Sequence, residues 1–183
     1  MKSNILKIFF TLLFVSLNAQ DKYMTRSGNI SFEASVPAFD EVNAVNKNAT
    51  ALLNIKTGDF AALALVKGFK FKIALMEEHF NENYLESDDF PKATFKGKID
   101  DFDIEKINKV DEKYVLNGEL SIHGQSKKIK IHPLISLKEG KILMNGSFKV
   151  MIKDFDIKIP SIVKGQIAEE VNITFDFELD QKK

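Results

Sequence analysis

The stretch MEEHFNENYLESDDFPKATFKG, residues 76–97, changes its apolar period in the middle and decides the fold. Its first part continues a short amphipathic helix expected over residues 74–85. The apolar stripe of this helix is Leu75, Met76, Phe80 and Tyr84. The polar run that ends at Pro91 breaks the helix, and from Ala93 onward apolar and polar residues alternate as in a strand. Since almost all of the remaining chain is typical of strands and hairpins, this is the one place where the chain leaves its sheet and returns.

Alternation of apolar and polar residues predicts roughly eight strands in hairpin succession. The continuously apolar run at residues 60–66 would also suit a helix, but the turn signal Gly58-Asp59 before it favours a strand, followed by a β-bulge at Lys67-Gly68. Residues 40–48 and 161–168 are expected as loops, the second with a helical turn. The extended segments cover residues 23–26, 29–36, 49–56, 60–66, 69–73, 93–99, 113–123, 127–137, 143–152, 154–159 and 170–180.

A chain of many short alternating strands, with no long helix to cover a second sheet face, folds as a β-sandwich or a β-barrel. A barrel is favoured because closure removes the exposed sheet edges. The predicted fold is therefore all-β: an eight-stranded antiparallel β-barrel, with the short helix at residues 74–85 closing one end. A barrel of this size is just wide enough to hold one ligand.

The N-terminus has the pattern of a secretory signal peptide. Lys2 and Lys7 supply the positive flank, an apolar run follows at residues 8–17, and Ala19 offers a small residue for cleavage. That run falls short of the ~20 residues that a membrane-spanning helix needs, although an uncleaved anchor is the alternative. We therefore expect a cleaved leader at residues 1–19, a single domain at residues 20–183 with no transmembrane segment, and a periplasmic or secreted location.

Composition excludes several classes of function. Cysteine is absent, which rules out a disulfide scaffold, a thiol nucleophile and cysteine metal sites. Removing Lys2 and Lys7 from the 26 basic residues leaves 24 against 26 acidic ones. Such a balance lacks the excess of positive charge that is typical of nucleic-acid-binding proteins. The chain also contains 16 phenylalanines and no tryptophan. A phenylalanine-rich interior suits either a packed core or an apolar cavity, and composition does not separate the two.

No pattern in the sequence indicates a cofactor or a metal site. Three histidines, His79, His123 and His132, lack the spacing of convergent zinc ligands, and exposed histidines are the simpler interpretation. The acidic clusters lack the spaced ligands and the glycine of a calcium-binding loop. A barrel enzyme that uses His123 and His132, or His79, remains an alternative that requires two polar groups to converge inside the barrel.

Two blocks of the sequence resemble the YceI-like family of exported lipid- or polyisoprenoid-binding proteins. The first is EEHFNENYLESDDFPKATFKGKI, residues 77–99, and the second is YVLNGELSIHGQSKKIKI, residues 114–131, with its LxGxLxIxG pattern. A third segment, FKVMIKDFDIKIP, follows at residues 148–160. The resemblance runs in order from about Gly28 to Leu179. It implies a lipocalin-like antiparallel barrel of eight strands with a helix at one end.

The resemblance also implies an isoprenoid-like lipid, or a similar amphiphile, held inside the barrel for carriage or sequestration without chemistry. A structural or stress-response barrel with a filled interior is the alternative to this binding function. The sequence does not determine the oligomeric state, and a dimer is one of the options. The side chains expected to line the interior and its lid are Phe32, Leu53, Phe69, Phe71, Met76, Phe80, Phe95, Leu116, Leu120, Phe148 and Phe175.

Overall fold

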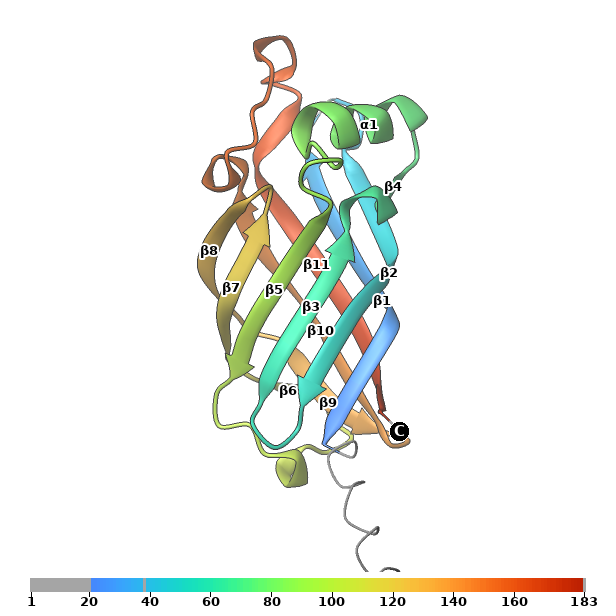
Figure 1. The fold of residues 1–183 in the computed structure, drawn as a ribbon, viewed down its shortest axis with the longest axis vertical. Coiled ribbons are helices and arrows are strands. Elements are labelled where there is room, and N and C mark those ends of the chain that lie inside the picture. The colour runs from blue at the N-terminus through green and yellow to red at the C-terminus, as the bar shows by residue number, and fades with distance from the viewer. Residues whose placement is uncertain (1–20, 38, 183) are drawn as a thin grey trace, which may run out of the picture.

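Eleven antiparallel strands form one curled sheet, a half-barrel, in the computed structural model, which describes residues 21–37 and 39–182 (Figure 1). The predicted leader at residues 1–19 lies outside the described residues. The strands are β1 (Lys22–Ser35), β2 (Asn43–Asn54), β3 (Asp59–Leu65), β4 (Lys70–Phe71), β5 (Lys92–Ile99), β6 (Glu112–Lys113), β7 (Leu116–Ile122), β8 (Gln125–Ile131), β9 (Leu134–Lys138), β10 (Lys141–Met151) and β11 (Ile167–Gln181).

The sheet has the order β6-β9-β10-β11-β1-β2-β3-β5-β7-β8, and β4 pairs with β2 beside this path. Strand β8 approaches β10 to within 8 Å between Cα atoms, but the two strands form no hydrogen-bonded ladder. The prediction of an antiparallel all-β fold with one short helix is confirmed. The prediction of eight strands is corrected to eleven among the described residues, and the predicted closed barrel is corrected to a curled half-barrel.

Local chemistry explains where the strand predictions were wrong. Pro133 cannot donate to a ladder, so the expected strand at residues 127–137 is divided into β8 and β9. The expected strand at residues 154–159 is instead the short 3₁₀ turn η4 (Ile152–Phe155) followed by loop, and the expected bulge at Lys67-Gly68 is the 3₁₀ turn η1 (Val66–Gly68). Strand β2 begins at Asn43, inside the expected loop at residues 40–48.

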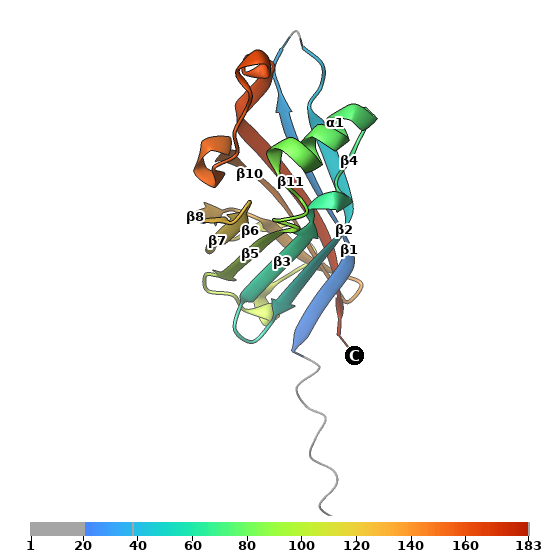
Figure 2. The ribbon, with the colours of Figure 1, turned by 45° about the horizontal axis from the view of Figure 1, so that its top comes forward.

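The expected helix is present and ends one residue before its predicted end. The α-helix α1 (Ala74–His79) continues into one π-helical turn, η2 (Phe80–Tyr84), and lies across the upper end of the half-barrel in Figures 1 and 2. The loop that precedes β11, which contains the 3₁₀ turn η5 (Ser161–Val163), projects at the same end. At the lower end the chain turns between β2 and β3 and passes through the 3₁₀ turn η3 (Ile104–Lys106).

The interior is filled solidly only in its lower half. Strand ends that meet at the lower end bring together side chains with essentially no exposed surface. These side chains are Leu53, Ile99, Leu116, Ile135, Ile142, Met144 and Leu179. Burial of this kind contributes roughly 1.5–3 kcal/mol for each large side chain, so the lower half provides the main hydrophobic core. The upper half, under α1, is organised differently.

Candidate functional site: an apolar cavity under the helix

A cavity of about 490 Å³ occupies the upper half of the half-barrel. Strands β1, β3, β5, β7, β8, β10 and β11 contribute to its wall, and α1 with η2 contributes to its cover. The lining is apolar except for Asp40, His79, Thr94, Gln166 and the phenol of Tyr84. The volume falls within the range of about 300–1,000 Å³ that is typical of sites for small molecules and cofactors.

Most of the residues expected to line the interior do line this cavity. They are Phe32, Phe69, Phe71, Met76, Phe80, Phe95, Leu120, Phe148 and Phe175. Leu53 and Leu116 do not line it, because they lie in the solid lower half, where they are completely buried. Alternation within a strand identifies the inward face correctly in both halves, but it does not distinguish packed positions from cavity positions.

Several lining residues were not among the expected site residues, although they lie in segments that were expected as strands. On β11, Val171 and Ile173 share the inward face with Phe175, and alternation along the strand was the signal that could have found them. In the loop before β11, Phe155, Ile157 and Ile159 also line the cavity. Their alternation suggested a strand, but here it reflects a loop that presents every second side chain to the cavity.

Four phenylalanine rings cluster where the lid, which is formed by α1 and η2, meets the wall of the cavity. Phe80 on η2 lies 5.3 Å from Phe32, 5.9 Å from Phe69 and 5.1 Å from Phe71, measured between ring centroids. These distances are within the range of favourable aromatic pairs. The lid is therefore packed onto β1 and onto the segment that carries β4 through aromatic contacts, while Met76 on α1 faces the same cavity.

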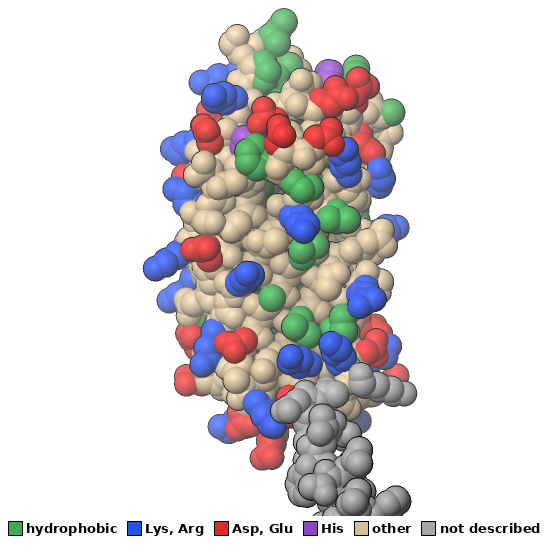
Figure 3. Space-filling model, in the orientation of Figure 1, with side chains coloured by type: hydrophobic (Ala, Val, Ile, Leu, Met, Phe, Trp, Pro, Cys, Tyr) green, Lys and Arg blue, Asp and Glu red, His purple; other side chains and the backbone are tan. Residues whose placement is uncertain are grey.

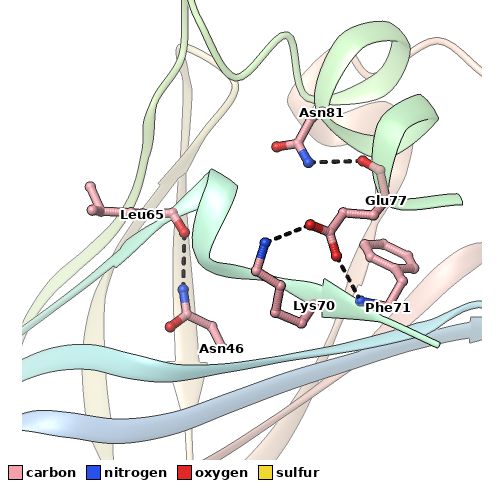
Figure 4. A network of polar contacts seen from close by, with 6 residues as sticks. All are labelled: Asn46, Leu65, Lys70, Phe71, Glu77 and Asn81. Atoms are coloured by element: carbon pink, nitrogen blue, oxygen red, sulfur yellow. Dashed lines mark hydrogen bonds and ion pairs between the residues drawn. The ribbon is translucent and has the colours of Figure 1, made fainter. Parts of the chain in front are cut away.

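A polar anchor fixes the first turn of α1 to β4 (Figure 4). The Glu77 carboxylate accepts a hydrogen bond from Lys70 Nζ at 2.5 Å and another from the Phe71 backbone N–H at 3.2 Å. The Asn81 side chain donates to the Glu77 carbonyl at 2.8 Å. The neighbouring acids Glu78 and Glu82 are exposed, whereas Glu77 is half-buried.

The anchor makes a prediction about pH. Hydrogen bonds from Lys70 and from the Phe71 N–H hold the pKa of the Glu77 carboxyl below its usual value. A carboxyl whose pKa is lowered on folding stabilises the protein above its unfolded pKa, and this contribution is lost as the pH falls through the folded pKa. We expect Glu77→Gln to lower Tm by about 3 °C at neutral pH, and the difference from wild type to shrink below about pH 4.

Glu78→Gln is the matched control, because Glu78 is the exposed neighbour on the same helix. Thermal unfolding followed by circular dichroism across this pH range should show no comparable difference for the control. Equal effects of the two substitutions would mean that helix propensity or net charge, rather than the anchor, causes the change.

The turn that carries the anchor is itself held by Asn46, whose side chain is buried in β2. Its side-chain amide donates to the Leu65 carbonyl at 2.9 Å (Figure 4), and its side-chain carbonyl accepts from the Asn48 backbone N–H at 2.9 Å. A Cβ atom at Gly68 would lie 2.5 Å from the Asn46 amide nitrogen, so only glycine fits there without a shift. Asn46 thus satisfies backbone groups where the chain leaves β3 for the lid.

The three histidines do not converge. His79 is exposed on α1 at the edge of the cavity, and His132 is exposed between β8 and β9. His123, in the β7–β8 turn, is largely buried: Nε2 lies 2.9 Å from a carboxylate oxygen of Glu86, and Nδ1 lies 3.0 Å from the Phe155 carbonyl. His123 therefore ties the segment after the lid to the β7–β8 turn and to η4.

The described part of the chain contains neither a metal-binding cluster nor a membrane-spanning helix. Residues 21–37 and 39–182 contain no cluster of three or more His, Asp or Glu side chains placed to hold a metal ion. Within the same residues, no helix has the length and apolar character required to span a bilayer.

Comparison with family models identifies one family. A family model described as YceI-like domain matches residues 20–179. A polyisoprenoid binding domain from Saccharophagus degradans, implicated in plant cell wall breakdown, matches with a TM-score of 0.77 at 12% identity, over 88% of this chain and 99% of that one. Comparison with curated proteins gives no match.

Two further solved structures are similar. BcnA of Burkholderia cenocepacia matches with a TM-score of 0.68 at 16% identity, over 83% of this chain and 95% of its own. The YceI protein of Campylobacter jejuni matches with a TM-score of 0.56 at 19% identity, over the full length of both chains. At these identities the structural likeness establishes the fold alone.

Proposed function

We propose that this chain, which belongs to the YceI-like family, is a binding protein that holds an isoprenoid-like or similar amphiphilic lipid in the cavity under α1. The observation that carries the proposal is the cavity of about 490 Å³, whose wall is almost entirely apolar. The description of the Saccharophagus degradans domain as polyisoprenoid binding supports the same ligand class. The protein would carry or sequester the lipid without chemically changing it.

The energetics of such a site are favourable for a flexible apolar chain. Transfer of each CH₂ group from water into an apolar site contributes about 0.8 kcal/mol. Ten such groups would contribute about 8 kcal/mol, which corresponds to micromolar affinity before the cost of immobilising the chain. Polar lining residues such as His79 and Gln166 are exposed, so a polar head group would remain at the open end.

The two alternative functions are less well supported by the geometry. A barrel whose interior is filled should contain no cavity of about 300 Å³ or more, and this cavity is larger. A histidine-dependent enzyme needs two polar groups that converge on the bound molecule. His123 instead meets Glu86 outside the cavity lining, and His132 is distant from the lid on an exposed turn.

The proposed location is the periplasm or the extracellular space. Its support is the signal-peptide pattern of residues 1–19, with Lys2 and Lys7 before an apolar run. A carrier in an aqueous compartment would solve the problem that an isoprenoid chain cannot cross water freely.

The test is to load the purified protein with farnesol or geranylgeraniol and to measure native mass spectra and Tm. We expect a one-to-one lipid adduct, and a Tm raised by about 8 °C when the free lipid is at about 100 times its Kd. A water-soluble alcohol with the same hydroxyl group but a short chain, such as butanol at the same concentration, is the control ligand and should leave Tm unchanged. Absence of both the adduct and the Tm shift, for the isoprenoid alcohols and for fatty acids, would refute the proposed function.

A further inference from the structure

The position of the cavity mouth follows from which lining residues are exposed. Six described lining residues are exposed, and they lie on only three segments. These segments are the β1–β2 loop, the start of the lid from residue 73 to residue 79, and the loop before β11. The six residues are Phe39, Asp40, Ile73, Leu75, His79 and Gln166. All three segments project from the upper end of the half-barrel in Figure 2, so the mouth opens there.

Large apolar side chains are exposed around this mouth. Half of the exposed large hydrophobic residues in the described chain belong to the three mouth segments. They are Phe39, Ile73, Leu75 and Ile162. Ile162, at the tip of the loop before β11, has 86% of its surface exposed, and Figure 3 shows hydrophobic side chains at the top of the molecule over this loop. Single exposed apolar residues are ordinary, but a set gathered from three segments around one opening marks an interaction site.

The charges around Ile162 indicate what it contacts. Residues 157–168 contain no acidic residue, and Lys158 and Lys164 flank Ile162. Neither lysine forms an ion pair with a described residue. An exposed apolar tip between two unpaired cations is complementary to a bilayer, where apolar chains lie just beneath anionic phosphates.

The remaining charges around the mouth indicate which side of it suits an anionic surface. Glu41 and Glu77 are paired with Lys72 and Lys70, whereas Glu78 on the outer side of α1 has no ion-pair partner among the described residues. Acidic side chains are visible over α1 in Figure 3. The loop before β11 therefore suits an anionic surface better than the exposed side of α1 does.

We infer that the mouth docks on an anionic phospholipid bilayer through the loop before β11, with Ile162 inserted among the lipids and Lys158 and Lys164 on the phosphates. The inference rests on the proposed function, because docking explains how a water-insoluble ligand enters. Contact between the mouth and the bilayer lets the isoprenoid chain of the ligand pass directly between two apolar environments, without exposing its apolar surface to water. Ile162, Lys158 and Lys164 do not line the cavity, so docking and ligand binding can be changed separately.

The experiment measures flotation of the full mature chain with vesicles of phosphatidylcholine and phosphatidylglycerol. We expect Ile162→Asp to weaken vesicle binding about tenfold, and the double variant Lys158→Glu/Lys164→Glu to weaken it by at least as much. The expected dependence on charge also requires weaker binding to phosphatidylcholine alone and at high salt.

Two matched controls separate docking at the mouth from general surface effects. Val110→Asp changes an apolar residue that is 70% exposed and lies at the opposite end, just before β6. Lys96→Glu/Lys128→Glu reverses two exposed lysines on the outer side of β5 and β8. Both controls should bind vesicles within about twofold of wild type, in line with the small effects of surface changes outside an interface.

Failure of the docking proposal is distinguishable from failure of the proposed function. The Tm shift with farnesol is measured on the same variants, and Ile162→Asp should keep it. No vesicle binding by wild type, or equal loss in Ile162→Asp and Val110→Asp, would overturn docking even if farnesol binds. If sedimentation shows that Ile162→Asp converts a dimer to a monomer and vesicles are not bound, the mouth is a self-association face and docking is likewise overturned.

Discussion

Ala62→Phe is expected to reduce lipid binding by at least about tenfold while the protein remains folded. Ala62 lies on β3, lines the cavity, and pairs across the sheet with Phe95 and Ala51. A phenyl ring at this position would project into the space that the ligand chain requires. Because an open cavity can accept the ring, the strain should be smaller than the 1–3 kcal/mol typical of adding groups to a filled core.

Ala61→Phe is the matched control for this experiment. Ala61 is the preceding residue on β3, and alternation directs its side chain to the outer face, away from the cavity. The control variant should bind farnesol or geranylgeraniol like wild type, measured by titration and by the Tm shift. If Ala62→Phe bound the lipid as tightly as Ala61→Phe, the ligand would not occupy this cavity.

Gly118→Ala is expected to lower the free energy of unfolding by about 3 kcal/mol. Gly118 on β7 pairs directly with Gly97 on β5, and the ring of Phe95 lies against both. A Cβ at Gly118 would be 2.3 Å from the Phe95 ring, 2.6 Å from the Lys96 carbonyl oxygen and 2.8 Å from the Gly97 Cα. The ring could rotate away, but the two backbone atoms belong to a paired strand and cannot yield without breaking the ladder.

Chemical denaturation of the variant, with the slope m checked for constancy, measures this effect. Gly165→Ala is the control, because a Cβ there meets no atom within 4 Å and the backbone has no positive φ. It should change stability by less than about 0.5 kcal/mol. If Gly118→Ala lowered the free energy of unfolding no more than the control does, β5 and β7 would be able to separate and admit a methyl group.

The fold could be predicted from the sequence where one face of a strand is buried and the other is exposed to solvent. Strand β11 has this pattern from Ile173 to Leu179, and the helix at residues 74–85 is marked by the change of period before Pro91. The start of β2 could not be predicted, because the polar Asn46 is buried there. Its hydrogen bonds go to Leu65, nineteen residues away, and to Asn48, so only the folded chain shows why it is inside.

The candidate site could be predicted only in part, for a physical reason. Leu53 and Phe32 both occupy inward positions of strands, yet Leu53 is packed on all sides and Phe32 borders a cavity. The difference depends on which side chains arrive from other strands, and alternation along one strand carries no such information. The role of Glu77 could not be predicted for a similar reason, because it depends on contacts with Lys70 and the Phe71 backbone N–H that only the position of β4 beside α1 provides.

The unequal filling of the two halves has a consequence for how the protein unfolds locally. In the lower half, Leu53 and Ile142 belong to a complete core, and their backbone amides should exchange with deuterium only through global unfolding. Around the cavity, Phe32 and Phe80 lack neighbours on one side, so this region should open at a lower free energy. The chain of a bound lipid would supply the missing neighbours. Lipid should therefore slow exchange near the mouth and merge two cooperative units into one.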